Sequence, residues 1–157
     1  LELVRPALGE VLYRPGEVVR HVYFPTTGVI SVVVTTAEGG SVEAGMVGKE
    51  GMLGLWAVLG AGTSPFEAVV QNPVEAYRAT AEAFVTEFAR QGALVDRLRR
   101  YSDAFMMQVS QSVACNCLHP AEQRLCRWLL MTHDRAAADE FVITQEFLGR
   151  MLGVRRM

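Results

Sequence analysis

Lysine, cysteine and histidine are scarce in this sequence of 157 residues, and long hydrophobic runs are absent. Lys49 is the only lysine beside 14 arginines, and there are three histidines. No run reaches the roughly 18 uninterrupted apolar residues that span a bilayer, and no charged segment precedes an apolar one as in a signal peptide. The sequence therefore predicts no membrane span and no secretory signal, and it favours a cytoplasmic location.

The three cysteines, Cys115, Cys117 and Cys126, form an odd-numbered cluster, which is untypical of a disulfide framework. Together with His119 they are candidate ligands for zinc or an iron–sulfur cluster. However, residues two apart on a helix point to different sides, and the sequence contains no Cys-x-x-Cys pair. We therefore expect reduced structural cysteines, no metal site and no bound cofactor.

Motifs of enzyme active sites are also missing. The sequence has no Gly-x-Ser-x-Gly elbow, no phosphate-binding loop and no paired-carboxylate arrangement. A jelly-roll enzyme of the cupin type needs two or three histidines and a carboxylate inside its barrel, but His21 is the only histidine before residue 119. These absences indicate that the protein is not an enzyme.

The composition is that of a folded chain, because half of the residues are hydrophobic and 20% are charged. The net charge of −2 hides an asymmetry along the chain. Residues 1–95 carry ten acids and six bases, whereas residues 96–157 carry seven acids and nine bases, all of them arginine. An anionic partner is therefore expected at the second part, although chance variation in solvated faces explains the difference equally well.

Short β-rich segments separated by glycine and proline occupy residues 10–79. Residues 18–24 form one such segment, closed by Pro25 and Gly28, and residues 29–36 carry the strongest strand signal. Further strands are expected at residues 42–47, 53–59, 67–71 and 74–78. The regular spacing of turns predicts a β-sandwich or β-roll rather than alternating strands and helices.

Helix signals dominate after Thr80. A helix is expected over residues 81–90, and residues 93–118, which lack glycine and proline, can form a helix of roughly seven turns. This long helix carries an apolar stripe at steps of four, three, four and four, formed by Leu94, Leu98, Tyr101, Phe105 and Val109. The stripe favours a homodimer in which two long helices pair, and packing on the chain's own β-domain is the alternative.

Residues 119–157 have the pattern of a helix-turn-helix. Pro120 begins a helix to about residue 133, and Thr144 is a candidate N-cap for a helix over residues 145–152. Gly153 is a C-terminal stop, and residues 154–156 open a further helix. In such a unit the last helix enters the major groove of DNA, where arginine can bond bidentately to guanine.

The order of these parts resembles the Crp/Fnr family of bacterial transcription regulators, whose first domain has the cyclic-nucleotide-binding jelly-roll fold. The resemblance covers nearly the whole chain. It depends on Arg-Pro-Gly-Glu at residues 14–17, on Gly-Lys-Glu-Gly-Met-Leu-Gly at residues 48–54, and on residues 121–125 and 143–156. It implies an α+β fold with an effector domain over residues 1–91, a dimerisation helix over residues 92–118, and a partial winged helix-turn-helix over residues 119–157.

Members of this family bind DNA as homodimers, and the resemblance extends that role to particular residues. Arg156 matches the base-reading arginine near the start of the recognition helix, and Arg155 lies beside it. Thr144 and Gln145 match the place where the first helix meets the phosphate backbone. The implied partners are double-stranded promoter DNA and a second copy of the chain, with RNA polymerase as a further candidate.

The sequence departs from the family at the effector cassette. Leu55 stands where a ribose-binding glutamate is expected, and Phe66 lies near the place of a phosphate-binding arginine. Residues 50–77 contain no cationic side chain, and burying a phosphate without a compensating charge is costly. We therefore expect an effector other than cAMP or cGMP: an apolar or uncharged ligand, a protein signal, or no ligand. The residues expected around such a pocket are Gly54, Leu55, Trp56, Ser64 and Phe66.

A second departure lies at the end of the sequence, where the recognition helix has barely begun at Met157 and the β-wing is missing. We expect this polypeptide to bind DNA weakly or not at all. The sequence as a whole predicts a homodimeric regulator of the Crp/Fnr type that senses an unidentified signal in its β-roll. The alternative is a stand-alone ligand-sensing or protein-interaction module that does not act through DNA.

Overall fold

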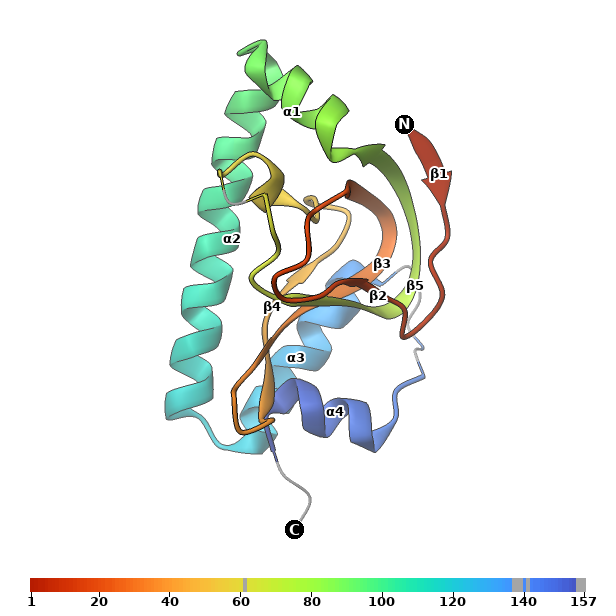
Figure 1. The fold of residues 1–157 in the computed structure, drawn as a ribbon. Coiled ribbons are helices and arrows are strands. Elements are labelled where there is room, and N and C mark those ends of the chain that lie inside the picture. Colours follow the sequence, from red (N-terminus) through yellow and green to blue (C-terminus); the bar gives the residue numbers. More distant parts are fainter. Residues whose placement is uncertain (61, 137–139, 141, 155–157) are drawn as a thin grey trace.

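Strands form the first half of the structure and helices the second (Figure 1). The structure is a computed structural model, and it describes residues 1–60, 62–136, 140 and 142–154. Its strands are β1 (Glu2–Val4), β2 (Val11–Tyr13), β3 (His21–Thr35), β4 (Ser41–Val47) and β5 (Glu67–Thr80). Its helices are the 3-10 turn η1 (Leu55–Ala57), α1 (Ala81–Ala89), α2 (Ala93–Leu118), α3 (Ala121–Arg135) and α4 (Gln145–Leu152).

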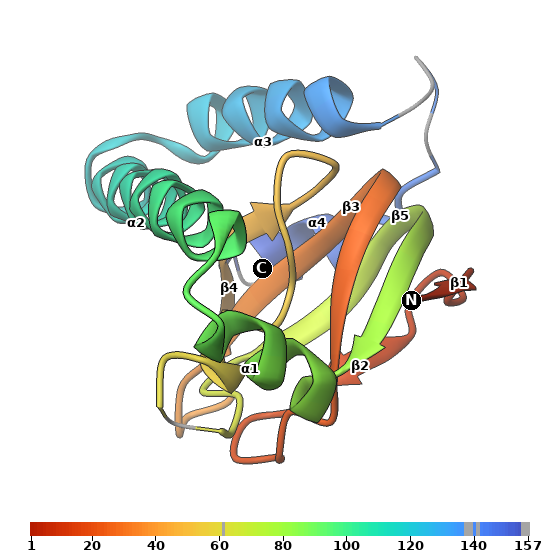
Figure 2. The same ribbon diagram turned by 90° about the horizontal axis from the view of Figure 1, so that it is seen from above.

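The sheet is antiparallel throughout and is built on two long strands. Its order is β1-β5-β3-β4, and β2 also pairs with β5. The register between β3 and β5 shifts three times between Pro25 and Ile30, which marks bulges that bend both strands. Gly28 has a φ of 78°, and a Cβ there would lie 2.1 Å from the carbonyl oxygen of Pro73, so only glycine fits. The bent strands curl into a roll (Figure 2).

Several of the predictions about strands are wrong. Pro25 and Gly28 do not end a strand, because β3 continues through them, and β5 likewise continues through Pro73. These residues lie at or opposite bulges, where a strand tolerates proline and needs glycine. The strand predicted over residues 53–59 is also absent: Leu53 forms an isolated bridge with Tyr23, and residues 55–57 form η1.

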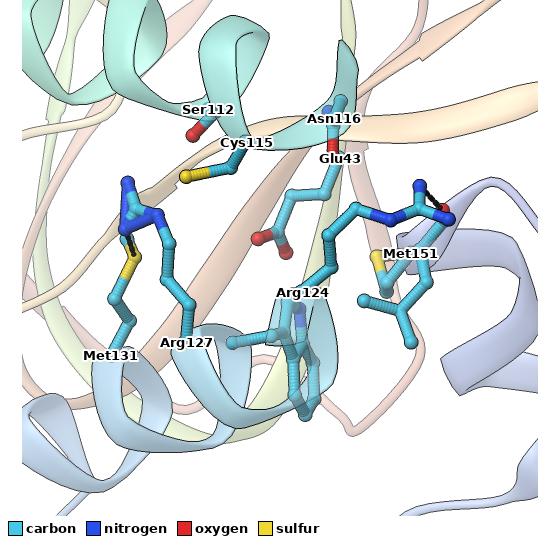
Figure 3. A pocket seen from close by; sticks show the side chains of 10 residues that line it. Glu43, Ser112, Cys115, Asn116, Arg124, Arg127, Met131 and Met151 are labelled. Atoms are coloured by element: carbon cyan, nitrogen blue, oxygen red, sulfur yellow. Dashed lines mark hydrogen bonds between the residues drawn. The ribbon is translucent and has the colours of Figure 1, made fainter. Parts of the chain in front are cut away.

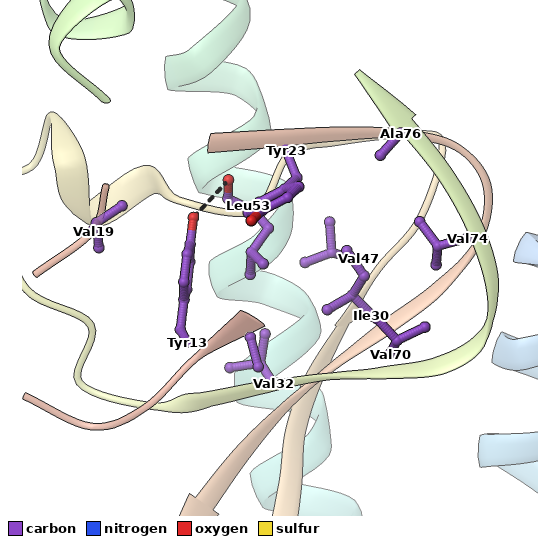
Figure 4. Packing of buried hydrophobic residues seen from close by; sticks show 11 residues of the cluster. Tyr13, Val19, Tyr23, Ile30, Val32, Val47, Leu53, Val70, Val74 and Ala76 are labelled. Atoms are coloured by element: carbon purple, nitrogen blue, oxygen red, sulfur yellow. Dashed lines mark hydrogen bonds between the residues drawn. The ribbon is translucent and has the colours of Figure 1, made fainter. Parts of the chain in front are cut away.

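The roll has an interior core and an outer apolar face, which meet at β3. Residues 28–33 of β3 are all buried, because successive side chains point to opposite faces and both faces are covered. Ile30 and Val32 belong to the interior cluster, together with Tyr13 and Leu53 (Figure 4). On the other face, buried residues of the sheet and of the C-terminal helices form a second cluster: Val29, Val33, Met46, Val69, Trp128, Met151 and Leu152.

Threonine hydroxyls cap two of the described helices, and the predicted Gly153 ends one of them. The Thr80 hydroxyl accepts a hydrogen bond from the Ala83 N–H at the start of α1, and Thr144 caps α4 in the same way through the Phe147 N–H. Gly153 ends α4 with a φ of 62°, the left-handed conformation of a C-terminal stop. The helices predicted over residues 81–90, 93–118 and 145–152 are confirmed to within one residue. Residues 155 and 156 of the further predicted helix lie outside the described residues.

Candidate functional site

Three of the residues predicted to surround an effector are in direct contact: Trp56 of η1 meets Phe66, and Phe66 is bonded by Ser64. The rings of Trp56 and Phe66 meet edge to face with their centroids 5.4 Å apart, and both pack against the interior core. The Ser64 hydroxyl donates to the Phe66 carbonyl at 2.7 Å and so closes the turn before β5. Leu55 points elsewhere, into a cluster with Phe84 of α1 and Leu98 of α2. The candidate site is therefore packed with its own aromatic side chains.

Gly54 lets the chain pass close to Tyr13 at the start of η1. Its φ is 113°, and a Cβ there would lie 2.7 Å from the Tyr13 hydroxyl oxygen and 2.8 Å from Val22 Cγ1. The Tyr13 hydroxyl donates to the carbonyl of His21. Burial raises the pKa of Tyr13 far above its usual value, so this hydroxyl stays a neutral donor. A polar group thus reaches the interior of the roll without a charge.

Tyr13 also lines a cavity of about 360 Å³, which lies at the turn between β2 and β3. Arg20 and Glu17 bring one charge of each sign to it, and none of the five predicted effector residues lines it. Sequence reasoning missed this cavity because its walls come from β2, the turn and β3. Its lining residues are Leu12, Tyr13, Glu17, Val18, Arg20, His21 and Tyr23.

The apolar stripe of α2 faces the chain's own roll, which was the alternative interpretation of the sequence. Leu98 is only 6% exposed and packs beside Leu55, while Phe105 packs against the interior core. The Tyr101 hydroxyl donates to the Met52 carbonyl at 3.0 Å. Leu94 also packs on the roll, whereas Val109 is half-buried outside these clusters. Much of the predicted dimer interface is therefore already covered within one chain.

Two features that sequence reasoning did not identify hold α2 in register on the roll. The Gln108 side chain accepts a hydrogen bond from the Met46 N–H at 2.6 Å and donates to the Met46 carbonyl at 3.2 Å. It thereby pairs with the free edge of β4 as a further strand would. Gly51 is the second feature, because a Cβ there would lie 1.9 Å from Cε2 of Tyr101. Neither feature has a local sequence signal.

A groove of about 1130 Å³ runs along α2 beside the roll. Leu94, Leu98, Tyr101 and Phe105 form part of its wall, whereas Val109 does not line it. On its exposed side the groove is lined by six residues of α2 that follow one another at alternating steps of four and three, which is the spacing of a heptad pattern. All six are exposed: Ala93, Arg97, Arg100, Ala104, Met107 and Gln111.

Helices α3 and α4 lie on the outer face of the sheet (Figures 1 and 2). The Gln71 amide donates to the Thr132 hydroxyl at 2.8 Å, and Arg150 forms an ion pair with Glu67. Thr144 and Gln145 are exposed at the start of α4. Arg156, the predicted base-reading residue, and Arg155 beside it lie outside the described residues.

Within the described residues, Cys115 is buried and hydrogen-bonded by Gln111, while Cys117 and Cys126 are exposed; all three are free thiols. No group of three His, Cys, Asp or Glu side chains in this part of the chain could hold a metal ion. None of the described helices combines the length and hydrophobicity that a membrane span requires.

Strands β2 to β5, η1 and α1 lie within the span of a known domain family. The model of the cyclic nucleotide-binding domain matches residues 4–91, which is more than half of the 157 residues. The chain belongs to the cyclic nucleotide-binding domain family. In this member of the family, α2 begins directly after the matched span. A search of curated proteins found no match.

Solved structures share the fold over almost the whole chain. FixK2 from Bradyrhizobium japonicum is 15% identical with a TM-score of 0.77, and the match covers 98% of this chain and 77% of that one. A CRP-family transcriptional regulator from Thermus thermophilus is 20% identical with a TM-score of 0.77, covering 96% and 77%. The c-di-GMP responsive regulator CLP from Xanthomonas campestris is 13% identical with a TM-score of 0.70, covering 98% and 80%. At these identities the likeness concerns the fold.

Proposed function

We propose that this chain is the sensing and dimerising part of a DNA-binding transcription regulator of the Crp/Fnr type, and not an enzyme. The observation that supports this best is the order of its parts. A cyclic nucleotide-binding roll leads into a helix of 26 residues, and a helix with a threonine N-cap and a glycine stop follows near the end of the chain. Regulators from two bacteria share this fold over at least 96% of the chain.

A second copy of the chain is the partner that we assign to the groove along α2. The six exposed residues of its heptad pattern suit a partner helix that inserts side chains between them. Ala104 permits close approach of the two helices, and Met107 supplies an adaptable apolar contact. The stripe predicted from the sequence, apart from Val109, then forms the inner wall of this interface, and the heptad residues provide the contacts with the partner.

A change in the roll would reach this interface through the contacts that hold α2. Leu55 of η1 packs beside Leu98, and Gln108 bonds the backbone of Met46. A signal can shift α2 only if it has different affinity for two arrangements of the roll. We expect η1 to be the part that differs, since its Trp56 meets Phe66 and its Leu55 packs beside Leu98 of α2.

The effector is proposed to be uncharged or apolar, or a protein signal, rather than cAMP or cGMP. Trp56 and Phe66 fill the site with aromatic surface, and residues 50–77 provide no cation for a phosphate. Calorimetric titration of the purified protein with cAMP and with cGMP should give no binding at micromolar concentration. Micromolar affinity for either nucleotide would overturn this part of the proposal, and Arg20→Ala would then test whether the cavity beside Tyr13 holds the phosphate.

DNA binding is proposed to use Thr144 and Gln145 for phosphate contacts and Arg156 for base contacts, with Arg155 beside it at the DNA. The test uses the protein together with any residues that follow Met157 in the natural polypeptide. Duplexes selected from a random pool are expected to share a palindromic site, because two recognition helices of a dimer lie about one DNA turn apart.

Two arginine substitutions distinguish the reading of bases from a general loss of positive charge. Arg156→Ala should weaken binding to the selected site by about 1–3 kcal/mol and relax its sequence preference. Arg99→Ala is the control, since Arg99 is exposed on α2 and paired with Asp96. Absence of binding to any duplex at low salt would contradict the proposal and favour a stand-alone sensing module.

A further inference from the structure

A carboxylate is buried where β4 meets three helices, outside the effector site. Glu43 of β4 is 8% exposed, and its side chain points between α2 and α3 (Figure 3). Its Oε2 atom has no hydrogen-bond partner. A cavity of about 30 Å³ adjoins it, enough for one water molecule. The Glu43 carboxyl group is therefore a buried polar group within the interface that holds α3 and α4 on the roll.

The Ser31 hydroxyl and the Trp128 N–H lie near enough to Glu43 to favour its charged form, but burial outweighs them. Neither Trp128 Nε1 nor Arg124 Nε, which come from residues that line the same cavity, makes a hydrogen bond of good geometry. Three arginines of α3 lie near the carboxylate, but their guanidinium groups bond other acceptors. Arg124 donates to the Leu152 carbonyl at 2.7 Å, Arg127 to the Met131 sulfur at 2.7 Å, and Arg135 to the Glu50 carboxylate at 2.6 Å.

The remaining surroundings of Glu43 are neutral. Ser31 reaches it from β3, and α2 contributes Ser112, Cys115 and Asn116 to the cavity. Helix α4 contributes Met151 and Leu152, which are apolar. The rest of the interface between sheet and helices is an apolar cluster crossed by the bond from Gln71 to Thr132. Removal of α3 and α4 would expose Glu43 to water.

We infer that Glu43 and its cavity form a proton-sensitive latch between the roll and the C-terminal helices. With Glu43 protonated, α3 and α4 dock on the outer face of the sheet; with Glu43 charged, docking is weakened and the helices are released. The latch needs neither effector nor DNA, so it goes beyond the proposed function. In a protein that works as proposed, it would make the position of the DNA-binding part depend on pH.

The direction of the effect follows from linkage. Burial raises the pKa of Glu43 from its ordinary 4.5 to about 8, against opposing effects of Ser31, Trp128, Arg135 and Arg127. The docked state therefore binds a proton more tightly than the released state does. The contribution of Glu43 to docking is complete below its ordinary pKa and is lost as the pH rises toward 8. Within this window the docking constant falls by up to about tenfold for each pH unit.

Cysteine labelling measures this equilibrium without DNA. Cys115 lines the cavity and is 4% exposed, whereas Cys117 is exposed on the same helix. Iodoacetamide labelling followed by mass spectrometry gives the rate at each thiol, and the ratio of Cys115 to Cys117 removes the shared rise of thiol reactivity with pH. Between about pH 6 and about pH 7.5 we expect this ratio to rise roughly 20-fold.

Two variants decide whether Glu43 is the titrating group. Glu43→Gln keeps the shape and remains neutral, so its labelling ratio should stay low and constant over the same pH range. Glu122→Gln is the matched control on the exposed side of α3 and should behave as the parent protein does. In a Trp56→Phe background, acrylamide quenching of Trp128 should follow the same pH dependence.

Several results would overturn the latch. A ratio that does not change with pH in the parent protein would show that Glu43 does not control docking. A pH dependence that persists in Glu43→Gln would assign it to another group, such as a histidine. Quenching of Trp128 that is strong at both pH values would show that the helices are not docked. None of these results bears on DNA binding, so the proposed function can stand or fail independently.

Discussion

Replacing Met107 by glutamate is expected to dissociate the dimer. The Met107 side chain is 66% exposed in the single chain and lines the groove assigned to a second copy. Full burial of a methionine contributes about 1.5–3 kcal/mol, so burial of the exposed two thirds contributes about 1–2 kcal/mol. Two copies meet in a dimer, which doubles this to about 2–4 kcal/mol. With glutamate at position 107 the dimer would lack this stabilisation and would also bear the cost of burying a charge.

Met106 offers a matched control for this prediction. It is the neighbouring residue, it is also 66% exposed, and it does not line the groove. Sedimentation equilibrium should show that Met107→Glu raises the dimer dissociation constant at least about 100-fold, since every 1.4 kcal/mol is a factor of about ten. Met106→Glu should change it by less than about threefold. Equal effects of the two substitutions, or a parent protein that is monomeric at micromolar concentration, would refute the assigned interface.

Two further substitutions test how α2 is held on the roll. Gly51→Ala should lower the free energy of unfolding by about 1–3 kcal/mol in urea, because its Cβ would overlap the Tyr101 ring. Gly149→Ala is the control and should not lower it, since the nearest atom to a Cβ there is the Val154 carbonyl oxygen at 3.4 Å. Gln108→Leu should cost about 1–3 kcal/mol by leaving both backbone groups of Met46 unpaired, and hydrogen exchange at the Met46 amide should accelerate; unchanged exchange would contradict that role.

The sequence predicted helices more accurately than strands, for a physical reason. The signals that end helices are local: Thr144 and Gly153 act within a few residues of the ends they specify. The continuity of a strand depends on its neighbour. Pro25 and Gly28 look like strand ends along the chain, but pairing with β5 carries β3 through them as bulges. The Cβ clash with Pro73, which makes glycine necessary, exists only once the two strands are paired.

The candidate site was predicted in part. The aromatic character of the effector region could be read along the chain, and the structure brings Trp56 and Phe66 into contact. The partner of the α2 stripe could not be read, since periodicity shows that a helix face is apolar but not what covers it. The roll covers most of the stripe, so the surface that we propose for a second copy is the adjacent groove, whose lining includes Ala104 and Met107.

By itself the sequence determined the class of fold, the long helix, the capped helix near its end, and the lack of cations between Lys49 and Arg78. These properties depend on composition and on spacing within a few residues. Only the tertiary structure decided which groups are buried together. Glu43 is one of ten acids in the first 95 residues, and nothing along the chain distinguishes it from the others. Its surroundings come from β3, α2, α3 and α4, and the packing of these distant segments removes the water that would otherwise solvate its charge.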